Sequence, residues 1–228
     1  MDEFEKYVFT QFAEAAKKIH HSPYAIGLDI YCIDDDLRKP TVRMLTNTHG
    51  HAEKHFPGCK RQRKGDASSE LEALWNHSYW NWKTEVTVGN EYVLFEGDYH
   101  DTKGIILRKK WIESLGLWYE DELEESNFDE ALELGRKINE FFDELCLKLA
   151  RSLHPILNTD LPIIFFNRES PDNETIILTF LANPRHLLDG YIAFIREGCG
   201  NSYAEFLEQD IDKSQLNYLS LRKRNLKR

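Results

Sequence analysis

The sequence lacks the features that mark membrane-spanning, disulfide-rich and disordered proteins. No apolar run in its 228 residues approaches the roughly 20 residues that a helix needs to cross a bilayer. Its four cysteines are widely scattered without paired spacing, which favours reduced thiols over a disulfide framework. The first residues, MDEFEKYVFTQ, are acidic and amphipathic and do not resemble a signal peptide. With 41% hydrophobic and 12% aromatic residues, the composition is that of a globular protein, which we expect in the cytoplasm.

Recognisable catalytic motifs are also missing from the sequence. It contains no G-x-S-x-G nucleophile elbow, no phosphate-binding P-loop and no signature of a catalytic cysteine. The lone cysteine in Gly198-Cys199-Gly200 is more typical of a turn at a helix end than of a nucleophile. A non-enzymatic function is therefore favoured, although an active site assembled from distant residues would leave no such motif and stays open.

Acidic residues outnumber basic ones by 39 to 29, so the formal net charge is -10. Five of the basic residues lie within residues 222–228, which we interpret as a basic tail after a single domain of residues 1–221. Without the tail, 24 basic residues face 39 acidic ones, and the body carries a charge near -15. An acidic body argues against nucleic acid as the main ligand, because phosphates need neutralising cations. It would speed the encounter with a basic protein.

The pattern of apolar residues predicts an α+β fold with one mixed, mainly antiparallel sheet covered by helices. We expect helices over residues 2–20, 105–116, 127–153 and 184–196, with Pro155 ending the third. Two strands are expected over residues 24–33 and 41–46. Two hairpins should follow, one over residues 84–95 with a turn at Gly89-Asn90, and one joining strands 163–166 and 176–181.

Residues 69–82 hold three of the five tryptophans and favour a helix. Five of these residues recur at helical spacing and form one apolar stripe: Leu71, Leu74, Trp75, Tyr79 and Trp82. Ser69 and Glu72 have the spacing of a capping box. The stripe itself is typical of a core. Trp80 lies outside it and, if exposed, would be an anchor for a protein partner together with Tyr79, since both residue types are enriched at interface hot spots.

Five further acidic residues stand close together in one run: Glu120, Asp121, Glu122, Glu124 and Glu125. Such a run is often an ordinary solvated face. In a chain with this net charge it is also a candidate contact surface for a basic partner.

Four residues in one segment have the ligand chemistry of a zinc site: His49, His51, His55 and Cys59. The last three would share a helix face, but Pro57 and Gly58 interrupt such a helix. Solvated loop histidines are the competing interpretation. The three aspartates at positions 34–36 could bind a cation, but a turn rich in aspartate is the favoured interpretation.

Four stretches of the chain together resemble a known group of proteins. They are YAIGLDIYCIDDDLRKPTVRMLTNT, ELEALWNHSYWNW, LPIIFFNRES and TFLANPRHLLDGYIAF. The chain resembles an uncharacterised bacterial family, a domain of unknown function whose genes often lie among toxin–immunity genes. The resemblance spans most of the chain, but not residues 49–64 or the acidic run. It implies a bacterial cytoplasmic domain with an immunity or binding role, and it supplies no established catalytic residues that could be carried over to this chain.

Our hypothesis from the sequence is a non-enzymatic cytoplasmic protein-binding domain, and more specifically an immunity protein that neutralises a basic toxin. Its expected contacts are Trp80, Tyr79 and the five residues of the acidic run. One alternative is a metal-binding or hydrolytic domain that uses residues 49–59. Another is a homo-oligomeric structural protein whose aromatic stripe is self-complementary. The sequence identifies neither the partner nor the oligomeric state.

Overall fold

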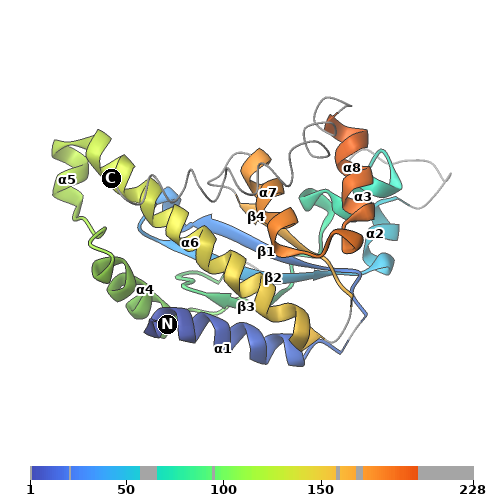
Figure 1. The fold of residues 1–228 in the computed structure, drawn as a ribbon, viewed down its shortest axis with the longest axis horizontal. Helices are drawn as coiled ribbons and strands as arrows, with labels where there is room; N and C mark the ends of the chain where they lie inside the picture. Colours follow the sequence, from blue (N-terminus) through green and yellow to red (C-terminus); the bar gives the residue numbers. More distant parts are fainter. Residues whose placement is uncertain are drawn as a thin grey trace.

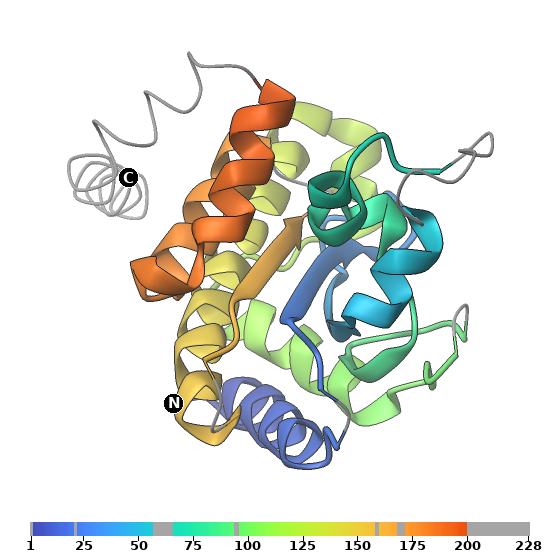
Figure 2. The same cartoon turned by 90° about the vertical axis from the view of Figure 1, so that its right-hand side faces the viewer.

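A four-stranded sheet with helices on both faces forms the centre of the structure, a computed structural model (Figures 1 and 2). The structure describes residues 2–20, 22–56, 66–93, 96–157, 160–167 and 172–199. The strands are β1 (Ala25–Cys32), β2 (Pro40–Asn47), β3 (Thr84–Val88) and β4 (Ile163–Asn167). Their order is β3-β2-β1-β4, with β2 antiparallel to both neighbours and β4 parallel to β1. The predicted α+β fold with a mixed, mainly antiparallel sheet is confirmed.

The helices of the described residues are α1 (Glu3–Lys17), α2 (His49–His55), α3 (Glu70–Trp75), α4 (Thr102–Ser114), α5 (Asp121–Ser126), α6 (Phe128–Leu157), α7 (Asp172–Ala182) and α8 (Asp189–Cys199). Short 3-10 turns are η1 (Ile33–Asp35), η2 (His77–Tyr79) and η3 (Arg185–Leu187). The four predicted helices are confirmed as α1, α4, α6 and, after η3, α8. Within the described part of the chain, no helix combines the length and apolar character needed to span a bilayer.

One face of the sheet packs against α1, α4 and α6. Alternate residues of β1 turn to this face and are fully buried: Ile26, Leu28 and Ile30. The ring of Phe4 from α1 lies 5.4 Å from that of Trp111 in α4 and 6.4 Å from that of Phe142 in α6. These aromatic contacts join the three helices into one layer over the sheet.

The opposite face packs against α3, α8 and the aromatic segment between α3 and β3. Trp80 is only 2% exposed, and its ring meets Phe166 of β4 edge-on at 4.9 Å. Its indole Nε1 donates a hydrogen bond of 2.9 Å to the carbonyl of Leu74. Tyr191 of α8 lies 6.0 Å from the ring of Trp75. The tryptophans of this segment therefore build a second core on the other side of the sheet.

The outer edge of β4 is protected by side chains of α7 and of the residue that follows it. Asn183 accepts a hydrogen bond of 2.7 Å from the Ile163 amide and donates one of 2.7 Å to the Ile163 carbonyl. The Phe165 amide donates to Thr179 Oγ1 at 3.0 Å. These side chains take the place of a fifth strand and block pairing with another chain at this edge.

The predicted strand over residues 176–181 is wrong, because this segment lies within α7. A short apolar run does not by itself distinguish a buried strand from a buried helix. In the fold, α7 packs against both β4 and α6, so Ile176, Leu178 and Phe180 are buried on different sides of the helix. The segment is apolar all round because it is covered on more than one side.

The hairpin predicted over residues 84–95 is also wrong within the described residues, which exclude 94 and 95. β3 pairs with β2, and residues 89–93 leave the sheet as a loop. Gly89 has a φ of +87°, as its turn requires. The side chain of Asn90 donates hydrogen bonds to the carbonyls of Tyr92 and Tyr99 and so joins the two arms of the loop.

Two helix ends differ from expectation. The helix predicted over residues 69–82 ends at Trp75, because the side chain of Asn76 accepts a hydrogen bond from the Ser78 amide and starts η2 instead. The Ser69 half of the capping box is present, but Glu72 bonds to Ser68. Pro155 does not end α6, which continues to Leu157.

Gly27 gives a test of the packing on the second face. A Cβ at this position would lie 2.9 Å from Trp80 Cζ3 and 3.0 Å from Phe166 Cε2. We expect Gly27→Ala to lower the free energy of unfolding by about 1–3 kcal/mol, because the rings must move. Gly50→Ala in α2 is the control, since a Cβ there meets nothing within 4 Å. It should leave stability unchanged or raise it by up to about 1 kcal/mol. Urea denaturation measures both, and equal stabilities would contradict the packing described.

Candidate functional site

A highly charged region lies at the end of the sheet where β1 turns into β2. The turn carries three consecutive aspartates, and α5, the start of α6 and the loop after β3 lie at the same end (Figure 1). Asp34 and Asp35 have positive φ angles of 58° and 57°. Aspartate tolerates this left-handed conformation better than most residues, so the tight turn explains the residue type.

Arg38 joins this turn to α5. Its guanidinium makes two hydrogen bonds to Asp36, of 2.9 and 3.0 Å, and lies 2.7 Å from a carboxylate oxygen of Asp121. It also lies 4.9 Å from the ring centre of Tyr119 and 5.7 Å from that of Trp118. Burial opposes the ionisation of Asp36, but the hydrogen bonds from Arg38 outweigh it and hold the pKa of Asp36 below its usual value.

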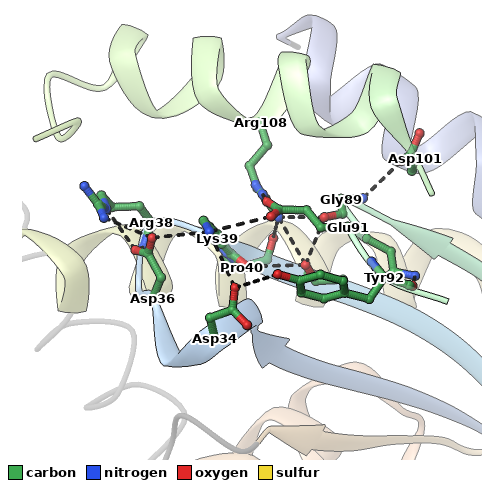
Figure 3. A network of polar contacts seen from close by, with 12 residues as sticks. Asp34, Asp36, Arg38, Lys39, Pro40, Gly89, Glu91, Tyr92, Asp101 and Arg108 are labelled. Carbon is green, nitrogen blue, oxygen red and sulfur yellow. Dashed lines mark hydrogen bonds and ion pairs between the residues drawn. The ribbon is translucent and has the colours of Figure 1, made fainter. Parts of the chain in front are cut away.

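Arg108 and Lys39 extend the network toward β3 (Figure 3). Arg108 is buried and donates from Nη1 to the carbonyls of Pro40 and Gly89, at 3.2 and 2.8 Å, and from Nη2 to Glu91 at 2.9 Å. Lys39 Nζ lies 3.6 Å from Glu91 Oε2. Burial lowers the pKa of Arg108 and the charge of Glu91 opposes that change. The buried guanidinium therefore holds the loop after β3 against the start of β2.

Asp101 anchors the same loop from the start of α4 (Figure 3). Its carboxylate accepts hydrogen bonds of 3.0 Å from the amides of Gly104 and Gly89 and one of 2.8 Å from the hydroxyl of Tyr7. The first bond caps α4, and the other two join α4 to β3 and α1. Burial and Asp101 together raise the pKa of Tyr7, so Tyr7 stays a hydrogen-bond donor.

Nine carboxylates gather in this region, which we call the acidic end: Asp34, Asp35, Asp36, Glu91, Glu120, Asp121, Glu122, Glu124 and Glu125. They face three cations, Arg38, Lys39 and Arg108, and the nearby Lys109, whose ammonium lies 4.3 Å from the ring centre of Trp118. The excess of negative charge is exposed to solvent, since all five predicted residues from Glu120 to Glu125 are exposed.

Apolar side chains are exposed beside this charge. Tyr92 is 46% exposed and its hydroxyl donates a hydrogen bond of 3.0 Å to Asp34. Val93 is 66% exposed, and Phe128 at the start of α6 is 59% exposed. No sequence pattern indicated these three residues, because their exposure depends on where the fold places the loop and the helix. The acidic end therefore offers both apolar contact and negative charge.

The predicted aromatic anchor is not at this surface. Trp80 is part of the second core, so its use as an exposed anchor does not hold in this fold. The physical reason is the early end of α3, which turns the next residues onto the sheet. Tyr79 is half-buried, with its ring 5.4 Å from that of His55.

The predicted zinc ligands are only partly brought together. His51 and His55 lie one helical turn apart with ring centres 5.1 Å apart, while the ring of His49 packs on Tyr24 at 4.8 Å. Burial and the charges of His55 and Lys54 lower the pKa of His51. Cys59 lies outside the described residues. Among those that are described, no three His, Cys, Asp or Glu side chains are arranged to hold a metal ion.

A buried charge pair on the second face of the sheet was missed from the sequence. Asp29 of β1 and Arg43 of β2 stand directly opposite each other, and the guanidinium lies 2.6 and 2.7 Å from Asp29 Oδ2. Both side chains are almost fully buried. The guanidinium lies 5.1 Å from the ring centre of Tyr31 and 4.8 Å from that of Trp82. A charged residue inside each of two adjacent apolar strands was the available signal.

The Asp29–Arg43 pair predicts strong coupling between the two positions. We expect Asp29→Asn and Arg43→Gln each to lower the free energy of unfolding by about 3–5 kcal/mol, because each removes the nearest opposite charge from a buried charged group. The double variant should lose clearly less than the sum of the two. Urea denaturation of the four proteins gives the coupling energy. Additive losses would show that the pair does not act as a unit.

The lowered pKa of Asp36 predicts a pH dependence of stability. A carboxyl group with a depressed folded-state pKa stabilises the protein above its unfolded pKa of about 4, and this contribution is lost as the pH falls through the folded value. Asp36→Asn should therefore be less stable than the wild type at pH 7 and should lose less stability on acidification below pH ~4. Asp35→Asn is the control, because Asp35 is exposed and asparagine tolerates its positive φ. Thermal unfolding from pH 2 to 7 measures both. Parallel curves for wild type and Asp36→Asn would contradict the assigned role.

Comparison with known proteins found no matching family model, no matching curated protein and no matching solved structure. The resemblance to a family found among toxin–immunity genes therefore stays a prediction.

Proposed function

We propose that this chain is a non-enzymatic binding protein that holds a basic protein partner at its acidic end. The observation that carries the proposal is the excess of exposed carboxylates over the cations of this end, of which Arg38, Lys39 and Arg108 are buried or half-buried and Lys109 is exposed. Charge of one sign concentrated at one end of a molecule attracts a partner of opposite sign before contact.

The buried part of the network supports this role by fixing the surface before binding. Arg108, held at 3% exposure, joins β2 to the loop that carries Tyr92 and Val93. Arg38 joins the β1–β2 turn to α5. A surface whose backbone is already ordered loses less conformational entropy on binding, and more of its contact energy appears as affinity.

The exposed apolar residues supply binding energy that surface charges alone do not provide. Surface ion pairs are weak in salt, typically below about 1 kcal/mol each. Buried aromatic contacts dominate most interfaces. We therefore assign Tyr92 and Val93 as the apolar contacts and the carboxylates as the surrounding rim that attracts and orients the partner.

The partner that best fits this surface and the family resemblance is a basic toxin, which would make the chain an immunity protein of the bacterial cytoplasm. An immunity protein must bind quickly, because an unbound toxin damages the cell that makes it. An acidic surface accelerates the encounter with a basic protein, by factors that decline as salt screens the charges.

The test is capture of a partner from the native host with matched charge-reversal variants. The binding variant is Glu122→Lys/Glu125→Lys at the acidic end. The control is Glu14→Lys/Glu197→Lys, which changes the net charge equally at exposed positions on α1 and α8. A basic protein should be retained by the wild type and the control at low salt, and at least about tenfold less by the binding variant. Equal retention by all three would place the contact elsewhere.

A second variant separates charge from apolar contact. Tyr92→Ala should weaken the captured complex without reducing its dependence on salt, because it removes no charge. The binding variant should reduce both the affinity of the complex and its dependence on salt. Loss of salt dependence in Tyr92→Ala would show that Tyr92 acts through Asp34 instead of through a contact of its own.

A further inference from the structure

A groove of about 210 Å³ lies between α2 and α3. Its floor is formed by Ala52, Ala73 and Leu74, and its sides by Glu53, Phe56 and Glu70. These helices lie at the other end of the sheet from α5 (Figures 1 and 2). The groove is thus separate from the acidic end, and an inference about it does not depend on the proposed function.

The floor of the groove is built by tightly packed small residues. Ala52 and Ala73 are 4% and 1% exposed and form a small apolar cluster with Ala67. Behind Leu74, the hydroxyl of Tyr24 donates a hydrogen bond to the Leu74 carbonyl and accepts one of 2.9 Å from Asn47. The floor is therefore formed and held in place before any ligand binds.

The helices that carry the sides are fixed as well. The side chain of Thr48 caps α2 by accepting a hydrogen bond of 3.2 Å from the His51 amide. Ser69 caps α3 by accepting one of 3.1 Å from the Glu72 amide. Caps of this kind stabilise the start of each helix, and with it the backbone that carries the sides of the groove.

The charge of the groove is negative. Glu53 comes from α2 and Glu70 from α3, and both are exposed. Neither makes an ion pair with another residue in the part of the chain that the structure describes. The remaining titratable group of the lining is His49, whose ring packs on Tyr24. Among the lining residues that the structure describes there is no lysine or arginine, so the two carboxylates face the groove without a cation from these residues.

We propose that this groove receives an arginine side chain of a partner protein. Its apolar floor suits the methylene stem of arginine, which packs on apolar surface while the head stays polar. The planar guanidinium can bond to carboxylates on two sides and stack on the ring of Phe56, whereas lysine offers only a point charge. The volume admits one long side chain and is below the roughly 300–1,000 Å³ of typical small-molecule pockets.

The proposal is tested with the peptide Ac-Gly-Arg-Gly-NH2 and its citrulline analogue, which keeps the shape and loses the charge. Titrations of the full-length protein are followed by amide chemical shifts at pH 8, above the usual titration range of histidine. The arginine peptide should shift Ala52, Phe56 and Ala73 in a saturable way. The citrulline peptide should bind at least about tenfold more weakly than the arginine peptide. The lysine peptide should also bind more weakly than the arginine peptide, but by a smaller factor than citrulline.

Two variants locate the binding. Glu53→Gln/Glu70→Gln should keep the thermal midpoint of the wild type, because both side chains are exposed, and should weaken the arginine peptide at least about tenfold. Glu122→Gln/Glu125→Gln removes the same charge from the acidic end and should bind the peptide as the wild type does. The proposal is overturned by any of four results. These are no saturable shift, equal binding of citrulline, equal binding of lysine, or unchanged binding by the groove variant.

Discussion

The two central strands of the sheet are buried on both faces, and this constraint shapes the rest of the structure. Every residue of β2 is buried, as are all but one of β1. Strands of this kind need a layer of helices on each side, which α1, α4 and α6 provide on one face and α3 and α8 on the other.

The second face carries the buried charges of Asp29 and Arg43, which need polar and aromatic neighbours in place of water. Tyr31 and Trp82 are two of these neighbours. A buried charge pair adds little net stability, but it strongly disfavours any arrangement that separates the two groups. The pair therefore specifies the register of β1 against β2.

The buried charges of this molecule stabilise its fold, whereas the exposed charges are available for binding. Arg108 and Asp101 lie inside and hold together the ends of β2, β3 and α4. On α5, the carboxylates of Glu122 and Glu125 are exposed, whereas Asp121 contacts Arg38 and helps to fix the helix. A change of charge at Glu122 and Glu125 should thus alter recognition without altering the fold, which is the separation that a binding surface needs.

The two negative regions stand at opposite ends of the sheet, at α5 and at the groove between α2 and α3 (Figure 1). They differ in kind. The acidic end is broad and open, so salt should screen it readily, whereas the groove is small and has an apolar floor. A broad surface suits attraction and orientation of a partner, and a groove suits selection of one side chain. Whether a single partner contacts both depends on its size, and the two proposals stand independently.

Local sequence patterns determined the long and regular elements. The stripe of α6, the alternation and apolar character of β1 and β2, and the exposure of the acidic run follow from periodicity and polarity within a few residues. Tertiary structure alone decided the burial of Trp80, the helical state of residues 176–181 and the contact between Arg38 and Asp121. Each depends on groups distant along the chain: Phe166 for Trp80, α6 and β4 for α7, and α5 for Arg38. A short apolar or aromatic segment is compatible with several conformations, and the surface that buries it selects one.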